Sequence, residues 1–164
     1  MSYLLDANVF ISAKNLHYGL DFCPAFWDWL IHKGNTGTVF SIDKVADEIS
    51  AGADALSTWA VDHGSNLFRR TPASLAAHFG QVSAWATSQH FTPAAINTFL
   101  QEADFYLVAH ALAGDHVLVT NETPATSNAR IKIPNACLGL GVRYMTPFQM
   151  LRTEQARFVL GRQA

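Results

Sequence analysis

The stretch YLLDANVFI (residues 3–11) joins a short apolar run to a carboxylate at its end. Residues 3–5 are large and apolar, which predicts a buried β-strand, and Asp6 follows it directly. In open α/β sheets ligands bind at the carboxyl ends of the strands, so this acid stands where a metal ion or a phosphate would be bound. The stretch therefore predicts an α/β fold with a site at the end of its first strand.

The rest of the chain alternates between strand and helix signals. Apolar or β-branched runs predict further strands at residues 38–41, 117–120 and 142–145. Proline, threonine and glycine boundary signals predict helices at residues 24–34, 43–50, 54–62, 73–89, 92–113 with a break near Gln101, and 147–159. This order predicts a three-layer α/β/α fold with a central parallel β-sheet.

Composition indicates one globular domain spanning residues 1–164. The chain is 49% apolar and 15% charged, which is typical of a protein with a full hydrophobic core. No run approaches the roughly 18 apolar residues of a membrane span, and no basic leader precedes an apolar run, so we expect a cytoplasmic protein. Cys23 and Cys137 form no C-x-x-C pair and are expected to be reduced thiols.

The charges are segregated along the chain. Residues 1–122 carry a net charge of −7, whereas residues 123–164 carry a net charge of +5. The basic residues of the second segment are Arg130, Lys132, Arg143, Arg152, Arg157 and Arg162. Such a segment could hold a phosphate backbone, or it could be the solvated end of a terminal helix, and charge alone favours the second interpretation.

Three later acids stand in settings comparable to that of Asp6, namely Glu48, Asp104 and Glu122. Asp104 is the strongest of them, because helical spacing places it on one face with Leu107, Val108, Ala111 and Leu112. No lysine or arginine occurs between Arg70 and Arg130 to pair with it locally. A buried, unpaired carboxylate either stays protonated or binds a cation, so Asp104 is a candidate metal ligand, with a partner from a distant segment as the alternative.

Each of the other acids has an ordinary structural alternative. Asp6 could cap the helix that follows it. Glu48 lies four residues after Lys44, at the spacing of a surface ion pair worth only ~0.3 kcal/mol. Glu122 precedes a Thr-Pro pair and could be a solvated loop acid. Taken one at a time, these alternatives stay open.

As a set, the four acids resemble the tetrad of the PIN-domain family, which consists of metal-dependent ribonucleases, many of them VapC-like toxins of toxin-antitoxin pairs. The resemblance runs from Tyr3 to about Phe158. It is closest to a PIN-like subfamily that shares the stretches FWDWL (residues 26–30), FSIDKV (residues 40–45) and KIPNAC (residues 132–137). The departure is Glu122, which stands where many PIN domains have aspartate.

The resemblance implies a metal-dependent endoribonuclease that is the toxin of a toxin-antitoxin pair. Asp6, Glu48, Asp104 and Glu122 would hold one or two Mg²⁺ or Mn²⁺ ions, directly or through water, and Asn8 and Thr120 would orient them. The implied partners are RNA and an antitoxin protein. A homodimer is left open, and no membrane partner is expected.

Physical chemistry supports a cation at such a cluster. Two carboxylates ~4 Å apart repel by about 4 kcal/mol at an effective dielectric constant of 20, so four of them need a counter-charge. One rival is a PIN-like module that binds RNA or protein without cutting. The other is a phosphoaspartyl phosphatase or receiver-like domain with Asp6 as nucleophile, which is disfavoured because Asn8 stands where the phosphatase motif needs a second aspartate.

Overall fold

A five-stranded parallel sheet forms the centre of the part of the chain that the structure describes, residues 1–161 of a computed structural model. Its strands run in the spatial order β3-β2-β1-β4-β5. Their bounds are β1 (Tyr3–Leu5), β2 (Val39–Ile42), β3 (Phe68–Arg69), β4 (Val117–Val119) and β5 (Tyr144–Met145). All residues of β1, β2 and β4 are buried, as expected for strands that are covered on both faces.

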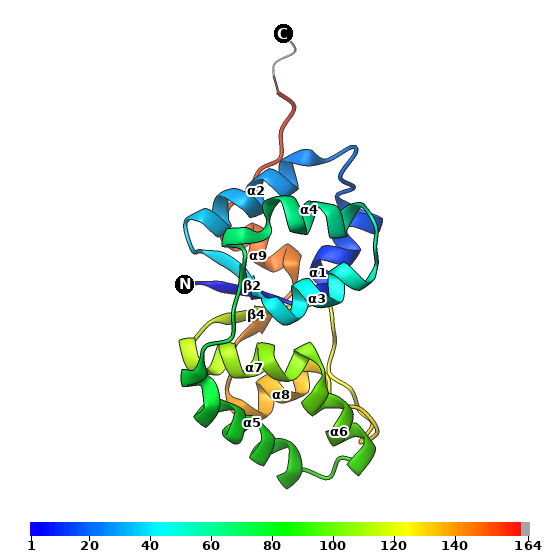
Figure 1. The fold of residues 1–164 in the computed structure, drawn as a ribbon, viewed down its shortest axis with the longest axis vertical. Coiled ribbons are helices and arrows are strands. Elements are labelled where there is room, and N and C mark those ends of the chain that lie inside the picture. The colour runs from blue at the N-terminus through cyan, green and yellow to red at the C-terminus, as the bar shows by residue number, and fades with distance from the viewer. Residues whose placement is uncertain (162–164) are drawn as a thin grey trace.

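Helices cover both faces of this sheet, which confirms the predicted three-layer fold (Figure 1). One layer holds α1 (Ala7–Ser12), α2 (Pro24–Asn35), α4 (Ala55–His63) and α9 (Pro147–Thr153). The other holds α5 (Ala76–Ser88), α6 (Pro93–Gln101), α7 (Ala103–Gly114) and α8 (Ile133–Leu140). Helix α3 (Asp43–Ala51) contacts α1 and α4 of the first layer and α7 of the second.

Short helical turns complete the element order. They are the π-helical turn η1 (Ala13–His17) and the 3-10 turns η2 (Gly64–Asn66) and η3 (Ala73–Leu75). Strand β1 lies at the middle of the sheet, with Leu4 opposite Phe40 on one side and Leu118 on the other. The residue that follows β1 therefore lies at the centre of the sheet's carboxyl edge.

The break predicted near Gln101 is present and positions part of the site. Helix α6 starts at the Thr92 cap, whose hydroxyl oxygen accepts a hydrogen bond from the Ala95 N–H at 3.1 Å. Glu102 then takes an extended conformation, with φ −89° and ψ 164°, and a new helix starts at Ala103. Asp104 consequently lies in the first turn of α7, rather than in the middle of one long helix.

Some elements of the fold differ from the sequence prediction. The last helix was predicted over residues 147–159 but ends at Thr153, because Gln155 has a left-handed backbone with φ 53° and the Ala156 N–H bonds back to the Leu151 carbonyl. Lys33 also holds Glu154 at this point, with 2.9 Å between Nζ and Oε2. The two-residue strand β3 and helix α8 were not predicted.

Close packing fixes α8 against α5. A Cβ atom at Gly139 would clash with the indole of Trp85, so glycine permits the approach of the two helices. Cys137 on α8 is buried and Cys23 is half-buried, and both are free thiols. No helix in residues 1–161 is both long enough and apolar enough to cross a bilayer.

Candidate active site

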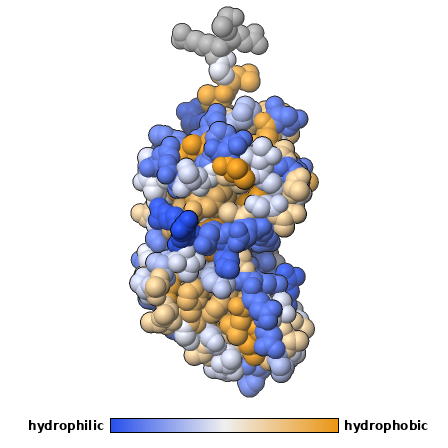
Figure 2. Space-filling view, viewed as in Figure 1, coloured by the Kyte–Doolittle hydropathy of each residue, from blue (hydrophilic) through white to orange (hydrophobic). Residues whose placement is uncertain are grey.

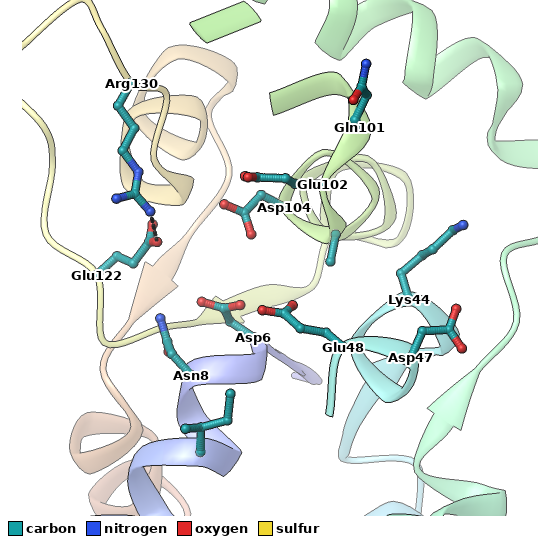
Figure 3. Close-up of a pocket in the computed structure, with 12 residues that line it drawn as sticks. Asp6, Asn8, Lys44, Asp47, Glu48, Gln101, Glu102, Asp104, Glu122 and Arg130 are labelled. Carbon is teal, nitrogen blue, oxygen red and sulfur yellow. Dashed lines mark ion pairs between the residues drawn. The ribbon is translucent and has the colours of Figure 1, made fainter. Parts of the chain in front are cut away.

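The four predicted acids reach one place from four different elements. Asp6 follows β1 directly, and Glu122 follows β4 in the loop that leads to α8. Glu48 lies on α3, the helix that follows β2, and Asp104 lies in the first turn of α7. Since parallel strands end at the same edge of the sheet, the side chains after β1 and β4 meet there, and α3 and α7 bring the other two beside them (Figure 3).

A cavity of about 530 Å³ lies at this edge and is lined by all four acids. Its acidic lining residues are Asp6, Asp47, Glu48, Glu102, Asp104 and Glu122, and its basic ones are Lys44 and Arg130. Asn8 also lines it. We refer to this space as the acidic cavity. Figure 2 shows a hydrophilic band across the middle of the molecule, between the two helical layers.

Asp6 is the most deeply placed of the acids. It is only 4% exposed, and burial raises its pKa to about 7, although a hydrogen bond from Thr120 lowers the pKa in part. The side chain occupies the position before α1 but makes no capping hydrogen bond, so the structure does not support the helix-cap alternative. Instead, the Asp6 carboxylate accepts a hydrogen bond from the Thr120 hydroxyl at 2.9 Å.

Thr120 and Asn8 form the hydrogen-bonded support of Asp6. The fully buried Thr120 hydroxyl oxygen accepts from Asn8 Nδ2 at 3.3 Å and from the Glu122 N–H at 3.1 Å, while its proton goes to Asp6. Asn8 in turn accepts from the Asn121 N–H at 3.1 Å. These bonds fix one carboxylate oxygen of Asp6, which also lines the acidic cavity.

Asp104 faces Asp6 across the acidic cavity (Figure 3). Its pKa is raised to about 8, mainly by burial and also by the charges of Asp6, Glu122, Glu102 and Glu48. The ion pairs found within residues 1–161 include neither Asp6 nor Asp104. Among the described residues, the alternative of a distant basic partner for Asp104 is therefore not met. Asp6 is buried and Asp104 is half-buried. Because burial is the main cause of both raised pKa values, we refer to the two acids as the buried pair.

Glu48 lies at the exposed rim of the acidic cavity, with its carboxylate turned toward Asp6 (Figure 3). Burial raises its pKa, and so does the charge of Glu102. The surface pair with Lys44 is not formed, because the Lys44 ammonium instead lies 4.9 Å from the centre of the Tyr106 ring. Glu48 is thus free to meet a ligand in the cavity.

Both carboxylate oxygens of Glu122 have partners within the protein. One carboxylate oxygen accepts a hydrogen bond from the Ile133 N–H at 3.0 Å, at the start of α8. The other lies 3.9 Å from the Arg130 guanidinium, and the Glu122 side chain is 16% exposed. A solvated loop acid is therefore not what the structure shows. Glu122 is an anchor of the loop before α8 as well as a wall of the acidic cavity.

Glu102 is a lining acid that the sequence prediction missed. It is exposed at the break between α6 and α7, two residues before Asp104, and its charge contributes to the raised pKa of Asp104. Its place at a predicted helix break beside a candidate ligand was the signal available. Of the C-terminal bases, Arg130 lines the cavity, and Arg162 lies outside the described residues.

The chemistry of these side chains fits a hydrated Mg²⁺ or Mn²⁺ ion. All the donors are oxygens, which hard cations prefer. Within residues 1–161 no three acids, histidines or cysteines converge closely enough to form a ready-made metal cage. Mg²⁺ does not need one, because it keeps several waters and is usually bound by one or two carboxylates together with substrate phosphates. Asp6, which is buried, and Asp104, which is half-buried, are the two acids placed to do this.

Comparison with known proteins supports the fold. Residues 3–158 match the family described as "Domain of unknown function (DUF4411)", and the chain belongs to that family. No curated protein matches the chain. A chain of the crystal structure of VapBC2 from Rickettsia felis bound to a DNA fragment from their promoter is similar, with a TM-score of 0.59, 16% identity, and coverage of 89% of this chain and 98% of that chain. At this identity the likeness shows a common fold alone.

Proposed function

We propose that this DUF4411 member is a metal-dependent endoribonuclease, and that it is the toxin of a toxin-antitoxin pair. The observation that carries the catalytic part is the buried pair Asp6 and Asp104, which faces a cavity at the carboxyl edge of the sheet and has no basic partner within residues 1–161. Buried carboxylates without a counter-charge are unfavourable, so their presence indicates that a cation completes the site.

Each residue of the site has a distinct part in this proposal. Asp6 and Asp104 would hold Mg²⁺ or Mn²⁺, and Glu48 and Glu122 would act directly or through water. Thr120 keeps one Asp6 oxygen fixed, and Asn8 keeps the Thr120 hydroxyl oriented toward it. When bound, a divalent cation supplies a water of lowered pKa and offsets charge on the phosphate oxygens. By resemblance to PIN domains, the products would carry 5′-phosphate and 3′-hydroxyl ends.

The toxin part of the proposal rests on resemblance. The structurally similar chain belongs to VapBC2 from Rickettsia felis. A partner that closes the acidic cavity would match it by charge, for example by placing an arginine or lysine side chain among the acids. Expression of the gene alone should then slow growth, and co-expression of an adjacent antitoxin gene should restore it. Harmless expression of protein shown to be folded and metal-loaded would contradict the toxin assignment but not the nuclease.

The nuclease is tested with purified protein and mixed RNA in Mn²⁺, Mg²⁺ or EDTA. We expect cleavage with either metal ion and none in EDTA. The Asp104→Asn variant, which removes one acid of this pair, should cut RNA on the order of a hundredfold more slowly, or slower still, with either metal ion. RNA that is bound but not cut by the wild-type protein would instead favour a non-catalytic PIN-like binding module.

A further inference from the structure

A second cavity, of about 420 Å³, adjoins the acidic cavity and shares Glu102 and Arg130 with it. Its other lining residues are Ala94, Ala95, Thr98, Phe99, Ala129 and Ile131. It lies between α6 and the segment that precedes α8, and we refer to it as the side cavity. Because the two cavities share these lining residues, a ligand in the acidic cavity would lie next to the side cavity.

Arg130 lines both cavities, and its guanidinium group makes no hydrogen bond to Glu122. Its side chain is 67% exposed, and its closest approach to Glu122 is 3.9 Å, which is too long for a hydrogen bond. An exposed pair at this distance contributes little stability, so the guanidinium can leave Glu122 for a stronger acceptor at small cost. A phosphate group is such an acceptor, because it can take two parallel hydrogen bonds from arginine.

The backbone that carries Arg130 is held on both sides. Upstream, the Thr92 N–H donates to the Asn128 carbonyl at 3.0 Å, which ties the segment to the start of α6. Farther back, Asn135 on α8 bonds both the N–H and the carbonyl of Ala125 at 3.0 Å. Downstream, the Ile133 N–H bonds Glu122. Arg130 is therefore an exposed side chain on an anchored segment.

The side cavity has the surface that an aromatic base requires. Ala95, Phe99 and Ile131 are at most 5% exposed and give it an apolar lining, while Thr98, Glu102 and Arg130 supply polar groups. Nucleobases combine an apolar face with polar edges, and they also stack on arginine guanidinium planes. A base in this cavity would thus have Arg130 beside both its face and the adjoining phosphate.

A second basic side chain, that of Lys44, lies at the other end of the acidic cavity. Lys44 and Arg130 lie on opposite sides of the acids in Figure 3. The Lys44 ammonium lies 4.9 Å from the centre of the Tyr106 ring and pairs with no acid within residues 1–161. A negatively charged backbone that crosses the cavity would meet a cation on each side of the acids.

From these contacts we infer that single-stranded RNA crosses the acidic cavity between Lys44 and Arg130, and that the side cavity receives the nucleobase next to the scissile phosphate. Arg130 is then the residue that holds a neighbouring phosphate and closes over that base. The inference rests on the proposed ribonuclease function and adds where its substrate lies. A base must be unstacked to enter the side cavity, which is why a single strand rather than a duplex is required.

Binding of a fluorescently labelled single-stranded oligoribonucleotide in Ca²⁺, measured by anisotropy at several salt concentrations, tests the charge contacts. Intact RNA is verified on a gel after each titration. Arg130→Gln should weaken binding about tenfold and reduce the slope of log K against log salt by about 0.7, as expected for one lost phosphate contact on a single strand. Arg152→Gln, which removes an exposed charge on α9, should leave both quantities unchanged.

A second variant tests the side cavity without changing charge. Thr98→Trp places a bulky ring at the mouth of the side cavity from an exposed position on α6, and Asn97→Trp places the same ring on a neighbouring exposed position outside it. Thr98→Trp should weaken binding by roughly 5- to 100-fold, the range of one lost stacking contact, with an unchanged salt slope. Asn97→Trp should bind like the wild type, and thermal melting of both confirms folding.

The outcomes separate this inference from the function on which it rests. If the wild type cuts RNA but Arg130→Gln and Thr98→Trp bind it normally, the substrate path is wrong and the nuclease stands. If the wild type neither binds nor cuts single-stranded RNA, both the substrate path and the proposed ribonuclease function are contradicted. If Thr98→Trp binds RNA normally but escapes growth rescue by a co-expressed antitoxin, the side cavity receives a protein segment and the inference is overturned.

Discussion

The buried acids and the rim acids of the same cavity behave differently. Asp6 is only 4% exposed and Asp104 is half-buried, and burial is the main reason why the pKa of the first is raised to about 7 and that of the second to about 8. Glu48 is exposed at the rim, and Glu122 already bonds the start of α8 and faces Arg130. The difference teaches that four acids at one edge need not be four equal ligands. In the proposed function a cation balances the charge of Asp6 and Asp104, whereas Glu122 already has partners within the protein.

The largest effect should come from the buried pair. Asp104→Asn keeps the size of the side chain but removes its charge, and we expect RNA cleavage to fall on the order of a hundredfold or more, because the ligand of the catalytic cation is lost. Glu122→Gln is the matched rim variant and should retain more activity than Asp104→Asn. Initial cleavage rates in Mn²⁺ measure both. Equal losses in the two variants would remove the distinction between buried and rim acids.

The stability of the metal-free protein should fall as the pH rises from about 4 to about 8. Folding raises the pKa of Asp6 and of Asp104 from 3.8, so in this window the folded state keeps protons that the unfolded state has released. Each such proton gives a slope of about −1.4 kcal/mol per pH unit in the free energy of unfolding. Urea unfolding in EDTA measures it, with Asp104→Asn as the comparison. A slope no shallower in that variant would contradict the assignment.

A smaller effect is expected from the support of the buried pair. Thr120→Val removes the hydroxyl that donates to Asp6 and leaves the Glu122 N–H and Asn8 without their shared acceptor. The loss should destabilise the protein by about 1–3 kcal/mol and raise the pKa of Asp6 further, because the Thr120 hydrogen bond lowers it. Thermal melting and the metal concentration for half-maximal cleavage report the two effects. Normal values for both would show that Asp6 is held by other contacts.

The smallest effect should distinguish two neighbouring rim acids on α3. Glu48 turns toward Asp6, whereas the carboxylate of Asp47 points away from the other acids (Figure 3). Glu48→Gln should therefore lower the cleavage rate several-fold, roughly 1 kcal/mol in the barrier, and Asp47→Asn should not. Comparison of the two rates at saturating metal measures this. An equal loss in both variants would indicate a general effect of charge at the rim rather than a directed contact.

Much of the fold could be predicted from local signals. The first strand has the predicted bounds, since its three residues are large and apolar and a carboxylate follows them. The break near Gln101 was also predicted, and it is this break that places Asp104 at the cavity. The end of α9 at Thr153 was not, because it depends on a left-handed residue, Gln155, and on a distant lysine that holds Glu154. Neither has a strong local signature.

The candidate site, too, could be predicted only in part from the sequence. The structure brings Asp6, Glu48, Asp104 and Glu122 to one cavity, as their positions after strands and at helix starts suggested. The bond from Ile133 to Glu122 and the position of Arg130 beside the side cavity depend on how the segment before α8 folds back across the sheet edge. That path is set by contacts far apart in the sequence, such as Thr92 with Asn128, which no periodicity reveals.

The central claim is that the buried pair Asp6 and Asp104 binds a divalent cation, and titration of Mn²⁺ into the metal-free protein at pH 7.5 tests it most directly. Calorimetry should show saturable binding to wild-type protein, with a matching rise in melting temperature by mass action. Asp104→Asn should bind Mn²⁺ at least tenfold more weakly, whereas Asp47→Asn should bind like the wild type. Undiminished Mn²⁺ binding by Asp104→Asn, or no saturable binding by the wild type, would contradict the account.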